Sequence, residues 1–241
     1  MLAVIAAGLG AGWGVLVPGL VRRYAVPWPA GEPRPAWRTA CDCGARLPPW
    51  WGRRCSCCGR RLGPPAGPAV ALAAAGCALV AAALGPRPEL PAFLVLVAAG
   101  VPLAFVDRAV LRLPDPLLLA AFTVGVVLLA ATGRPGPLAR AVLAAAASGA
   151  GYAALVLLPG SPLGYGDVKL GAVLGLYLGW LGWPAVVAGA VAVPVVNAPY
   201  VAFLLLTGRA GRTTPVPYGP AMLAAALAAI ALQTWCVTPH R

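Results

Sequence analysis

The sequence predicts an all-α fold: a polytopic membrane helix bundle of about eight transmembrane helices with a short cysteine-containing cytoplasmic loop. Hydrophobic residues make up 61% of the chain and charged residues only 10%, a composition typical of membrane proteins. A bilayer span needs about 20 apolar residues, and runs near this length recur throughout the chain. They lie at 2–21, 66–85, 90–106, 116–132, 139–158, 168–182, 184–206 and 219–236.

The chain divides once, between an N-terminal part (1–65) and a membrane-embedded core (66–241). After the first apolar run, residues 22–65 are polar, rich in arginine and proline, and hold five of the seven cysteines. In the core, small residues recur at helical spacing at Gly171, Gly175 and Gly179, and again over 144–151. Such faces let transmembrane helices approach closely, so we expect both segments to pack against other helices.

The basic residues predict the orientation. With eight spans and the N-terminus outside, fourteen of the eighteen lysines and arginines fall on the cytoplasmic side, in accord with the positive-inside rule. We therefore expect a multi-pass protein of the plasma (inner) membrane with both termini outside. The net charge of +12 then reflects topology and contacts with anionic lipid. No interleaving of aromatic and basic residues indicates a nucleic-acid partner.

Two aspartates lie at membrane boundaries in a chain that has only six acidic residues. Asp107 follows the third apolar run and Asp167 precedes the sixth, so both fall on the predicted cytoplasmic side. Carboxylates at the edge of the hydrocarbon are costly and usually functional. Each also has a structural alternative: a salt bridge from Asp107 to Arg108 or Arg112, and a helix N-cap for Asp167.

A pair of carboxylates suits acid–base chemistry. Two like charges close together do not both ionise cheaply, so one carboxyl group keeps its proton. The ionised group can take a proton from water while the protonated group polarises a scissile carbonyl. The single histidine, His240, lies beyond the last apolar run, and nothing in the sequence suggests a nucleophilic triad. The leading hypothesis is therefore an intramembrane aspartyl protease.

A third aspartate near the pair has a structural interpretation. Asp115 lies between Pro114 and Pro116. Aspartate at the N-cap followed by proline at the first helical position is a favourable helix start. We therefore expect Pro114 and Asp115 to be structural residues near the site.

The residues around Asp167 are expected to shape the site. Gly164 and Gly166 precede the aspartate, and glycine permits unusual backbone angles and close approach by another segment. Lys169 follows two residues later. It is interpreted in two ways: as a residue that tunes the dyad or contacts substrate, or as an ordinary cytoplasmic-side cation.

Three segments resemble the type IV prepilin peptidase family, a group of GxGD membrane aspartyl proteases. They are Asp107-x6-Pro114-Asp115, Gly164-Tyr165-Gly166-Asp167-Val168-Lys169-Leu170, and the proline-rich segment Thr214–Pro220. Sixty residues separate Asp107 from Asp167, and the order and spacing match the family as well. The resemblance covers about residues 65–236.

The resemblance implies a function and a set of partners. Asp107 and Asp167 would be the catalytic dyad, facing the cytoplasm, and proteolysis would need no cofactor. Substrates would be prepilin or pseudopilin precursors, cut after a glycine that ends a basic leader and before a hydrophobic helix. Other expected partners are the lipid bilayer and the pilus or secretion assembly machinery. Many family members also methylate the new N-terminus with S-adenosylmethionine.

Four cysteines of the polar loop form a candidate metal site. The family often carries two Cys-x-x-Cys pairs here, whereas this chain has one Cys-x-Cys pair and one Cys-x-x-Cys pair. Paired cysteines followed by glycine in a reducing cytoplasm favour zinc over disulfides, and free thiols remain the alternative. The candidate ligands are Cys41, Cys43, Cys55 and Cys58.

The first span departs from the family pattern. Where the family commonly has a Gly-Ser-Phe-Leu-Asn stretch, this chain has the apolar segment Gly12–Pro18, which favours proteolysis over methyl transfer. Two other classes of function use the same residues. One is a proton-coupled transporter, disfavoured because its carboxylates should lie near the bilayer midplane. The other is a non-catalytic membrane scaffold, disfavoured by the intact aspartate motifs.

Overall fold

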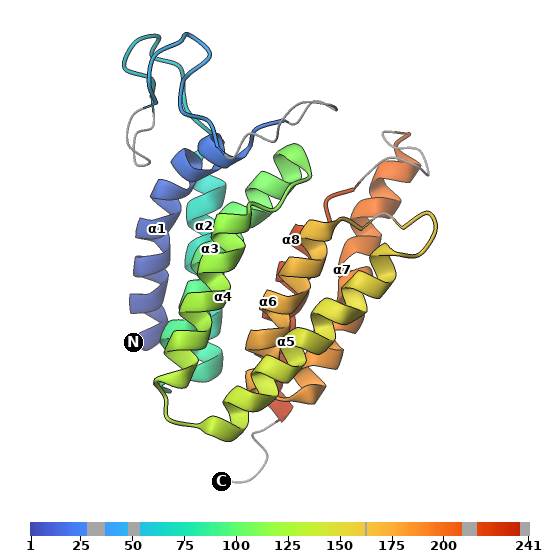
Figure 1. Cartoon of the computed structure of the whole chain (residues 1–241). Helices are drawn as coiled ribbons and strands as arrows, with labels where there is room; N and C mark the ends of the chain where they lie inside the picture. Colours follow the sequence, from blue (N-terminus) through green and yellow to red (C-terminus); the bar gives the residue numbers. More distant parts are fainter. Residues whose placement is uncertain (28–36, 48–53, 162, 209–215, 237–241) are drawn as a thin grey trace.

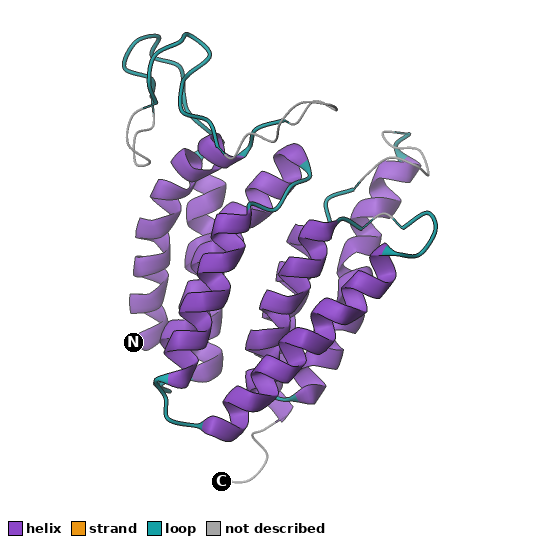
Figure 2. Ribbon diagram, viewed as in Figure 1, coloured by secondary structure: helices purple, strands orange, loops and turns teal. Residues whose placement is uncertain are grey.

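The structure is a computed structural model that describes residues 1–27, 37–47, 54–161, 163–208 and 216–236. His240 and the Thr214–Pro215 part of the proline-rich segment lie outside these ranges. The described residues form eight helices joined by loops, and pair as strands only in two isolated bridges (Figures 1 and 2). The helices are α1 (Leu2–Tyr24), α2 (Ala66–Leu84), α3 (Leu90–Val110), α4 (Asp115–Ala130), α5 (Pro135–Val156), α6 (Tyr165–Leu181), α7 (Trp183–Leu206) and α8 (Gly219–Cys236).

The all-helical, multi-pass prediction is confirmed. Five helices (α1, α2, α3, α5 and α7) are long and apolar enough to cross a membrane, and α4 and α8 are shorter apolar helices. Helix α6 has 17 residues and carries Asp167 and Lys169 near its start. Because hydrogen bonding continues past the apolar run, α3 extends to Val110 instead of ending at 106, and α6 begins at Tyr165 instead of 168.

Small residues bring α5 and α6 together, as the sequence predicts. A Cβ on Gly175 would lie 2.6 Å from the carbonyl oxygen of Ala144 and from the Ser148 hydroxyl. A Cβ on Gly179 would collide with the Ala144 side chain. Arg140 fixes the other end of this pair by donating to the Gly179 and Trp180 carbonyls at 2.8 and 2.7 Å.

The first two helices pack in the same way. Side chains at Gly10 and Gly14 of α1 would collide with the backbone of α2 at Ala73 and Val70. The cysteine loop leaves α1 and returns to α2 at one end of the bundle. That is also the end where α3 finishes and where α4, α6 and α8 begin (Figure 1). The end of α3 and the starts of α4, α6 and α8 therefore lie at the same end of the bundle as the loop.

Candidate active site

Asp107 lies in the last turn of α3 and points into the bundle. Its side chain is buried, with 5% of the residue exposed. Its Oδ2 accepts a hydrogen bond from the backbone N–H of Gly219, the first residue of α8, at 2.9 Å. The first N–H groups of a helix lack intrahelical partners and carry partial positive charge. The carboxylate of Asp107 therefore caps a helix that begins 112 residues later in the chain.

Arg108 and Arg112 make other contacts in place of the salt bridge that would have explained Asp107 structurally. Within the described residues, the Arg112 guanidinium donates to the Val26 carbonyl at 3.0 Å. The Arg108 guanidinium lies over the Tyr200 ring, 5.9 Å from its centroid. Asp107 is thus held by a backbone amide.

Asp167 lies in the first turn of α6 and is also buried, with 8% exposed. Its Oδ2 accepts the backbone N–H of Gly164 at 2.9 Å, and its own N–H donates to the Gly164 carbonyl at 3.0 Å. The expectation that Asp167 could itself be the N-cap is wrong by three residues. Gly164 is the N-cap, and the aspartate side chain reaches back to it from inside the helix.

Both aspartates line one cavity of about 420 Å³ at the loop end of the bundle. Its walls come from the turn after α3, the starts of α4 and α6, and the residues that precede α8. The cavity brings together the predicted site residues Asp107, Asp115, Gly164, Gly166, Asp167 and Lys169. It also includes residues that were not predicted as site residues, among them Leu111, Arg112, Leu113 and Tyr218.

Asp115 and Lys169 form an ion pair at the cavity mouth. Lys169 Nζ lies 2.8 Å from Asp115 Oδ1, and each side chain is about half exposed, at 52% and 51%. The pair joins the start of α4 to the start of α6. The predicted N-cap is shifted by one residue, because Pro114 is the N-cap and Asp115 is the first helical residue. The structural role of Pro114 and Asp115 stays a prediction.

The glycines of the Asp167 motif allow neighbouring segments to approach closely, and they do not adopt unusual backbone angles. Gly164 has φ −105° and ψ 165°, which any residue adopts. A Cβ on Gly166 would lie 3.2 Å from the Cβ of Leu113, so the α6 start presses against the turn after α3. The left-handed residue is Leu111, with φ 51°, an uncommon conformation for a side chain of this size.

Gly219 is the site residue that sequence reasoning did not single out. A Cβ there would lie 2.9 Å from Asp107 Oδ2 and 3.2 Å from its Cγ. Any larger residue would displace the carboxylate. Gly219 lies within the Thr214–Pro220 segment that carries part of the family resemblance, but only the fold places it beside Asp107.

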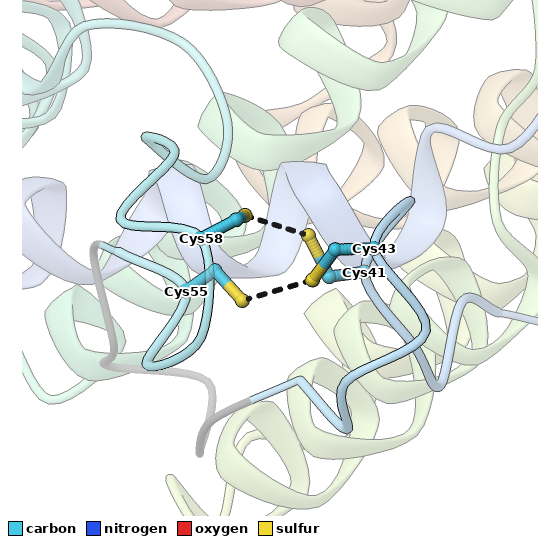
Figure 3. A group of neighbouring side chains, drawn as sticks. All are labelled: Cys41, Cys43, Cys55 and Cys58. Atoms are coloured by element: carbon cyan, nitrogen blue, oxygen red, sulfur yellow. Dashed lines mark hydrogen bonds between the residues drawn. The ribbon is translucent and has the colours of Figure 1, made fainter.

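The four candidate cysteines converge in the loop, away from the aspartate cavity. Cys41 Sγ lies 3.8 Å from Cys58 Sγ, and Cys43 Sγ lies 3.6 Å from Cys55 Sγ (Figure 3). All four sulfur atoms lie within 4.8 Å of one another. The short Cys-x-Cys spacing therefore does not prevent the first pair from facing the second.

This geometry fits a tetrahedral thiolate site. Zinc–sulfur bonds of about 2.3 Å put tetrahedral sulfur atoms about 3.8 Å apart, near the two separations in the cluster. Backbone N–H groups of Cys58 and Cys57 lower the pKa of the Cys55 thiol to about 6, and the N–H of Cys43 lowers the pKa of Cys41. Both shifts favour the thiolate, which is the metal-binding form. The residues present therefore fit zinc.

Asp42 fastens this cluster to the bundle. Its carboxylate lies 3.0 Å from the Arg22 guanidinium at the end of α1, 2.6 Å from that of Arg38 and 2.9 Å from that of Arg60. The hydrogen bond from Arg22 holds the pKa of Asp42 below its usual range, and the positive charges of Arg22, Arg38 and Arg60 act in the same direction. The clamp is therefore charged at neutral pH. It would be lost only as the pH falls through that lowered pKa.

Comparison with known proteins gives one family. Residues 90–197 match the sequence model of the type IV leader peptidase family. Two curated proteins of Aeromonas salmonicida, one from strain A449, are each named prepilin leader peptidase/N-methyltransferase and are 35% identical to the chain over 147 residues. That alignment covers 59% of this chain and 49% of each relative, so the chain spans about half the length of the curated relatives it matches. No solved structure matches significantly.

The family match includes the segments that form most of the cavity. It contains α3 with Asp107, the start of α4, and the start of α6 with Asp167. Over residues 90–197, the chain is similar to the type IV leader peptidase family.

Proposed function

We propose that this protein is a prepilin leader peptidase, an aspartic endopeptidase that removes the basic leader from type IV prepilin or pseudopilin precursors. One observation carries the proposal: two buried carboxylates from separate helices line a single cavity. The family match and the names of the two relatives point to the same activity.

The geometry supports a water-activating dyad. Asp107 and Asp167 share a cavity in which two full negative charges would repel, so one carboxyl group holds a proton while the other is ionised. The ionised group removes a proton from water as the oxygen attacks the scissile carbonyl, and the protonated group donates to the developing oxyanion. As the C–N bond breaks, the proton taken from water passes to the departing amine nitrogen, and the proton given to the oxyanion returns to its carboxylate. The products are one new carboxyl group and one new N-terminus.

The hydrogen bonds from Gly164 and Gly219 serve this chemistry in a specific way. Each fixes one oxygen, Oδ2, of its carboxylate at 2.9 Å. Backbone donors also favour negative charge without supplying a mobile proton. The pair is therefore positioned without a permanent cationic partner that would hold both groups ionised.

We also propose an orientation for the protein in the membrane. The cavity end of the bundle carries the arginine-rich loop, so the positive-inside rule directs it to the cytoplasm of a plasma (inner) membrane protein. Both termini would then lie outside, because α1 begins at the opposite end of the bundle from the cavity and eight crossings return the chain to that side. Precursors whose basic leaders remain in the cytoplasm would meet the dyad there.

Zinc would act in the loop and not in proteolysis. Its four ligands would be Cys41, Cys43, Cys55 and Cys58. Its role would be to stabilise the fold of a segment that has a small apolar core. Two observations on methyl transfer point in different directions. The relatives' names include it, whereas the apolar Gly12–Pro18 segment departs from the pattern associated with it.

The test is cleavage of a precursor. The chain is co-expressed with a type IV prepilin, and the mass and N-terminal sequence of the pilin are measured. We expect a single cut after the glycine that ends the leader, lost in Asp107→Asn and in Asp167→Asn while both variants stay in the membrane. A mature product heavier by one methyl group would add methyl transfer to the activity. Full cleavage by both variants would refute the dyad.

A further inference from the structure

A second, larger cavity lies between α5 and α7. It measures about 710 Å³ and is lined almost wholly by apolar and small side chains of these two helices. Figure 1 shows α5, α6 and α7 in the same half of the molecule. The two helices barely touch each other, because each packs instead on α6 or α8. An open apolar groove is left between them.

One face of each helix lines this groove. On α5, Ala147, Gly151 and Leu155 follow one another at four-residue spacing, and all three are exposed. A Cβ on Gly151 would meet no atom within 4 Å, whereas a Cβ on Gly149 would touch the Ala172 side chain of α6 at 3.3 Å. The packed face and the open face of α5 are therefore distinct. On α7, Val187 and Val191 are likewise exposed, at 61% and 62%.

The groove is continuous with the aspartate cavity. Leu163 and Tyr218 line both spaces, so the groove ends where the cavity begins. Tyr152 forms part of the groove, and its ring fills the space beside Gly171, one helical turn after Asp167. A chain segment lying in the groove would thus lead directly to the dyad.

The groove and the cavity together match a segment that is polar at the cleavage junction and apolar beyond it. The cavity is lined by three carboxylates, those of Asp107, Asp115 and Asp167, against the two cations Arg112 and Lys169. The groove has no charged residue in its lining. Along α7 it runs from Trp183 to Pro194, about 16 Å at the helical rise of about 1.5 Å per residue. That length accommodates about eleven residues of a helix.

We propose that the groove between α5 and α7 binds the apolar helix that follows the cleavage junction of the precursor. This inference rests on the proposed function, since it names the place where that substrate is held. The open, small-residue face of α5 lets the substrate helix approach closely, and the junction then lies beyond Leu163 and Tyr218 beside the aspartates. A helix held in this way aligns the scissile bond without contributing to the chemistry.

Crosslinking tests the placement. A photoreactive residue is placed at Gly151 or Ala190 in the groove, and at the exposed α5 position Val142 as a control outside it. The full chain carries Asp167→Asn so that the precursor stays intact, and both proteins are reconstituted in nanodiscs. We expect the groove positions to crosslink to the apolar segment just after the junction, with competition by unlabelled precursor. Equal crosslinking from Val142, or reaction of the groove positions with lipid alone, would overturn the proposal.

A filling substitution gives an independent readout. Gly151→Phe places a ring in the groove at a position where a Cβ meets no atom within 4 Å, and should raise KM for the precursor at least tenfold while kcat stays near the wild-type value. Val142→Phe should leave both constants unchanged. Unchanged KM in Gly151→Phe, in a preparation whose wild type cleaves the precursor, would refute the groove and leave the peptidase standing. A wild type that cleaves no prepilin would refute the proposed function and the groove with it.

Discussion

At the scale of single residues, the two cavity aspartates are held in the same way. Each presents one oxygen to the N–H of a glycine at the start of a helix, Asp107 to Gly219 and Asp167 to Gly164. Helix N-termini are natural sites for carboxylates. The two hydrogen bonds differ in sequence separation, however: three residues separate Asp167 from Gly164, whereas 112 residues separate Asp107 from Gly219. Only the second depends on the packing of α3 against α8.

Gly219 should therefore be intolerant of a side chain. In Gly219→Ala, the added Cβ would lie 2.9 Å from Asp107 Oδ2, so the carboxylate must move away from its donor. A displacement of about 1 Å in a catalytic group can cost about 100-fold in rate, and we expect a loss of that order in kcat. The measurement is precursor cleavage by the purified variant.

The matched control for this change is Gly12→Ala, because a Cβ at Gly12 meets no atom within 4 Å. It should retain wild-type cleavage and thermal stability. Gly219→Ala should also remain folded, since the atom it displaces belongs to a side chain. Wild-type kcat in Gly219→Ala would mean that this hydrogen bond does not position the dyad.

The ion pair between Lys169 and Asp115 leads to a different expectation. Both groups are about half exposed, and exposed pairs contribute about 0–1 kcal/mol. Lys169→Met should therefore lower the stability only slightly and change kcat/KM by less than about fivefold. Thermal melting and cleavage kinetics measure the two effects. A loss of more than 100-fold in kcat would instead assign Lys169 to the reaction.

The sequence reveals the site residues that stand out locally, and it misses those whose contacts exist only after distant helices pack. Asp107 and Asp167 were found because a carboxylate is conspicuous at the edge of an apolar run. Gly164 was found because it lies three residues from Asp167. Gly219 was not singled out, since its contact with Asp107 exists only after α3 and α8 pack. The one-residue shift at Asp115 reflects how loosely proline and aspartate define a helix start.

At the scale of elements, the cysteine loop is a compact unit with its own small core. Buried Cys41, Cys55 and Leu62 form that core. Each cysteine pair is closed by a short bridge, Ala40 with Arg46 and Arg54 with Arg61. So little apolar surface gives limited stability, which is why a metal would contribute strongly to the folding of this segment.

The protein should therefore be purified with about one zinc ion per chain. Cys43→Ser and Cys58→Ser should each lower the bound zinc, because each removes one of four converging thiols. Cys57→Ser is the matched control, since Cys57 is exposed and does not belong to the cluster. Elemental analysis of the purified variants measures the content. Zinc that is absent from the wild type, or lost equally in Cys57→Ser, would favour free thiols.

Asp42 should hold the loop against α1 by charge. Asp42→Asn removes the negative partner of Arg22, Arg38 and Arg60, so trypsin should cut the loop several-fold faster at neutral pH. Asp115→Asn, which alters an ion pair elsewhere, should leave the loop digestion unchanged. Identical digestion of Asp42→Asn and wild type would show that the clamp does not restrain the loop.

Helix boundaries show what apolar patterning omits. The run 90–106 ends where hydrophobicity ends, but α3 continues to Val110 because the polar residues of a last turn still hydrogen-bond along the helix. The difference matters here, since it turns Asp107 from a loop residue into a buried helical residue. The small-residue pattern was more informative, because it predicted that both segments pack closely against other helices, and the structure shows that they pack on each other.

At the scale of the whole molecule, the candidate functional residues lie at one end of the bundle. The turn after α3, the starts of α4, α6 and α8, and the cysteine loop all lie there. Hydropathy predicts the eight helices and charge predicts which end faces the cytoplasm. Neither predicts that α3 and α8 are neighbours or that a groove opens between α5 and α7, because these depend on packing between distant segments.

The orientation has a direct consequence for labelling. Cys57, in the loop, should react with a membrane-impermeant maleimide only in inside-out vesicles. A cysteine introduced by Gly136→Cys, in the exposed start of α5 at the opposite end, should react only in intact cells or right-side-out vesicles. The reverse pattern would invert the proposed topology and place the dyad away from the precursor leader.

The central claim is that Asp107 and Asp167, and not the cavity's other carboxylate, perform the hydrolysis. It is tested most directly by cleavage rates of one precursor with three purified variants: Asp107→Asn, Asp167→Asn and Asp115→Asn. We expect the first two to lose about 1000-fold or more, and Asp115→Asn to remain within about fivefold of the wild type, because its exposed ion pair is worth little. Cleavage that survives in either of the first two variants, or that fails equally in all three, would contradict the account.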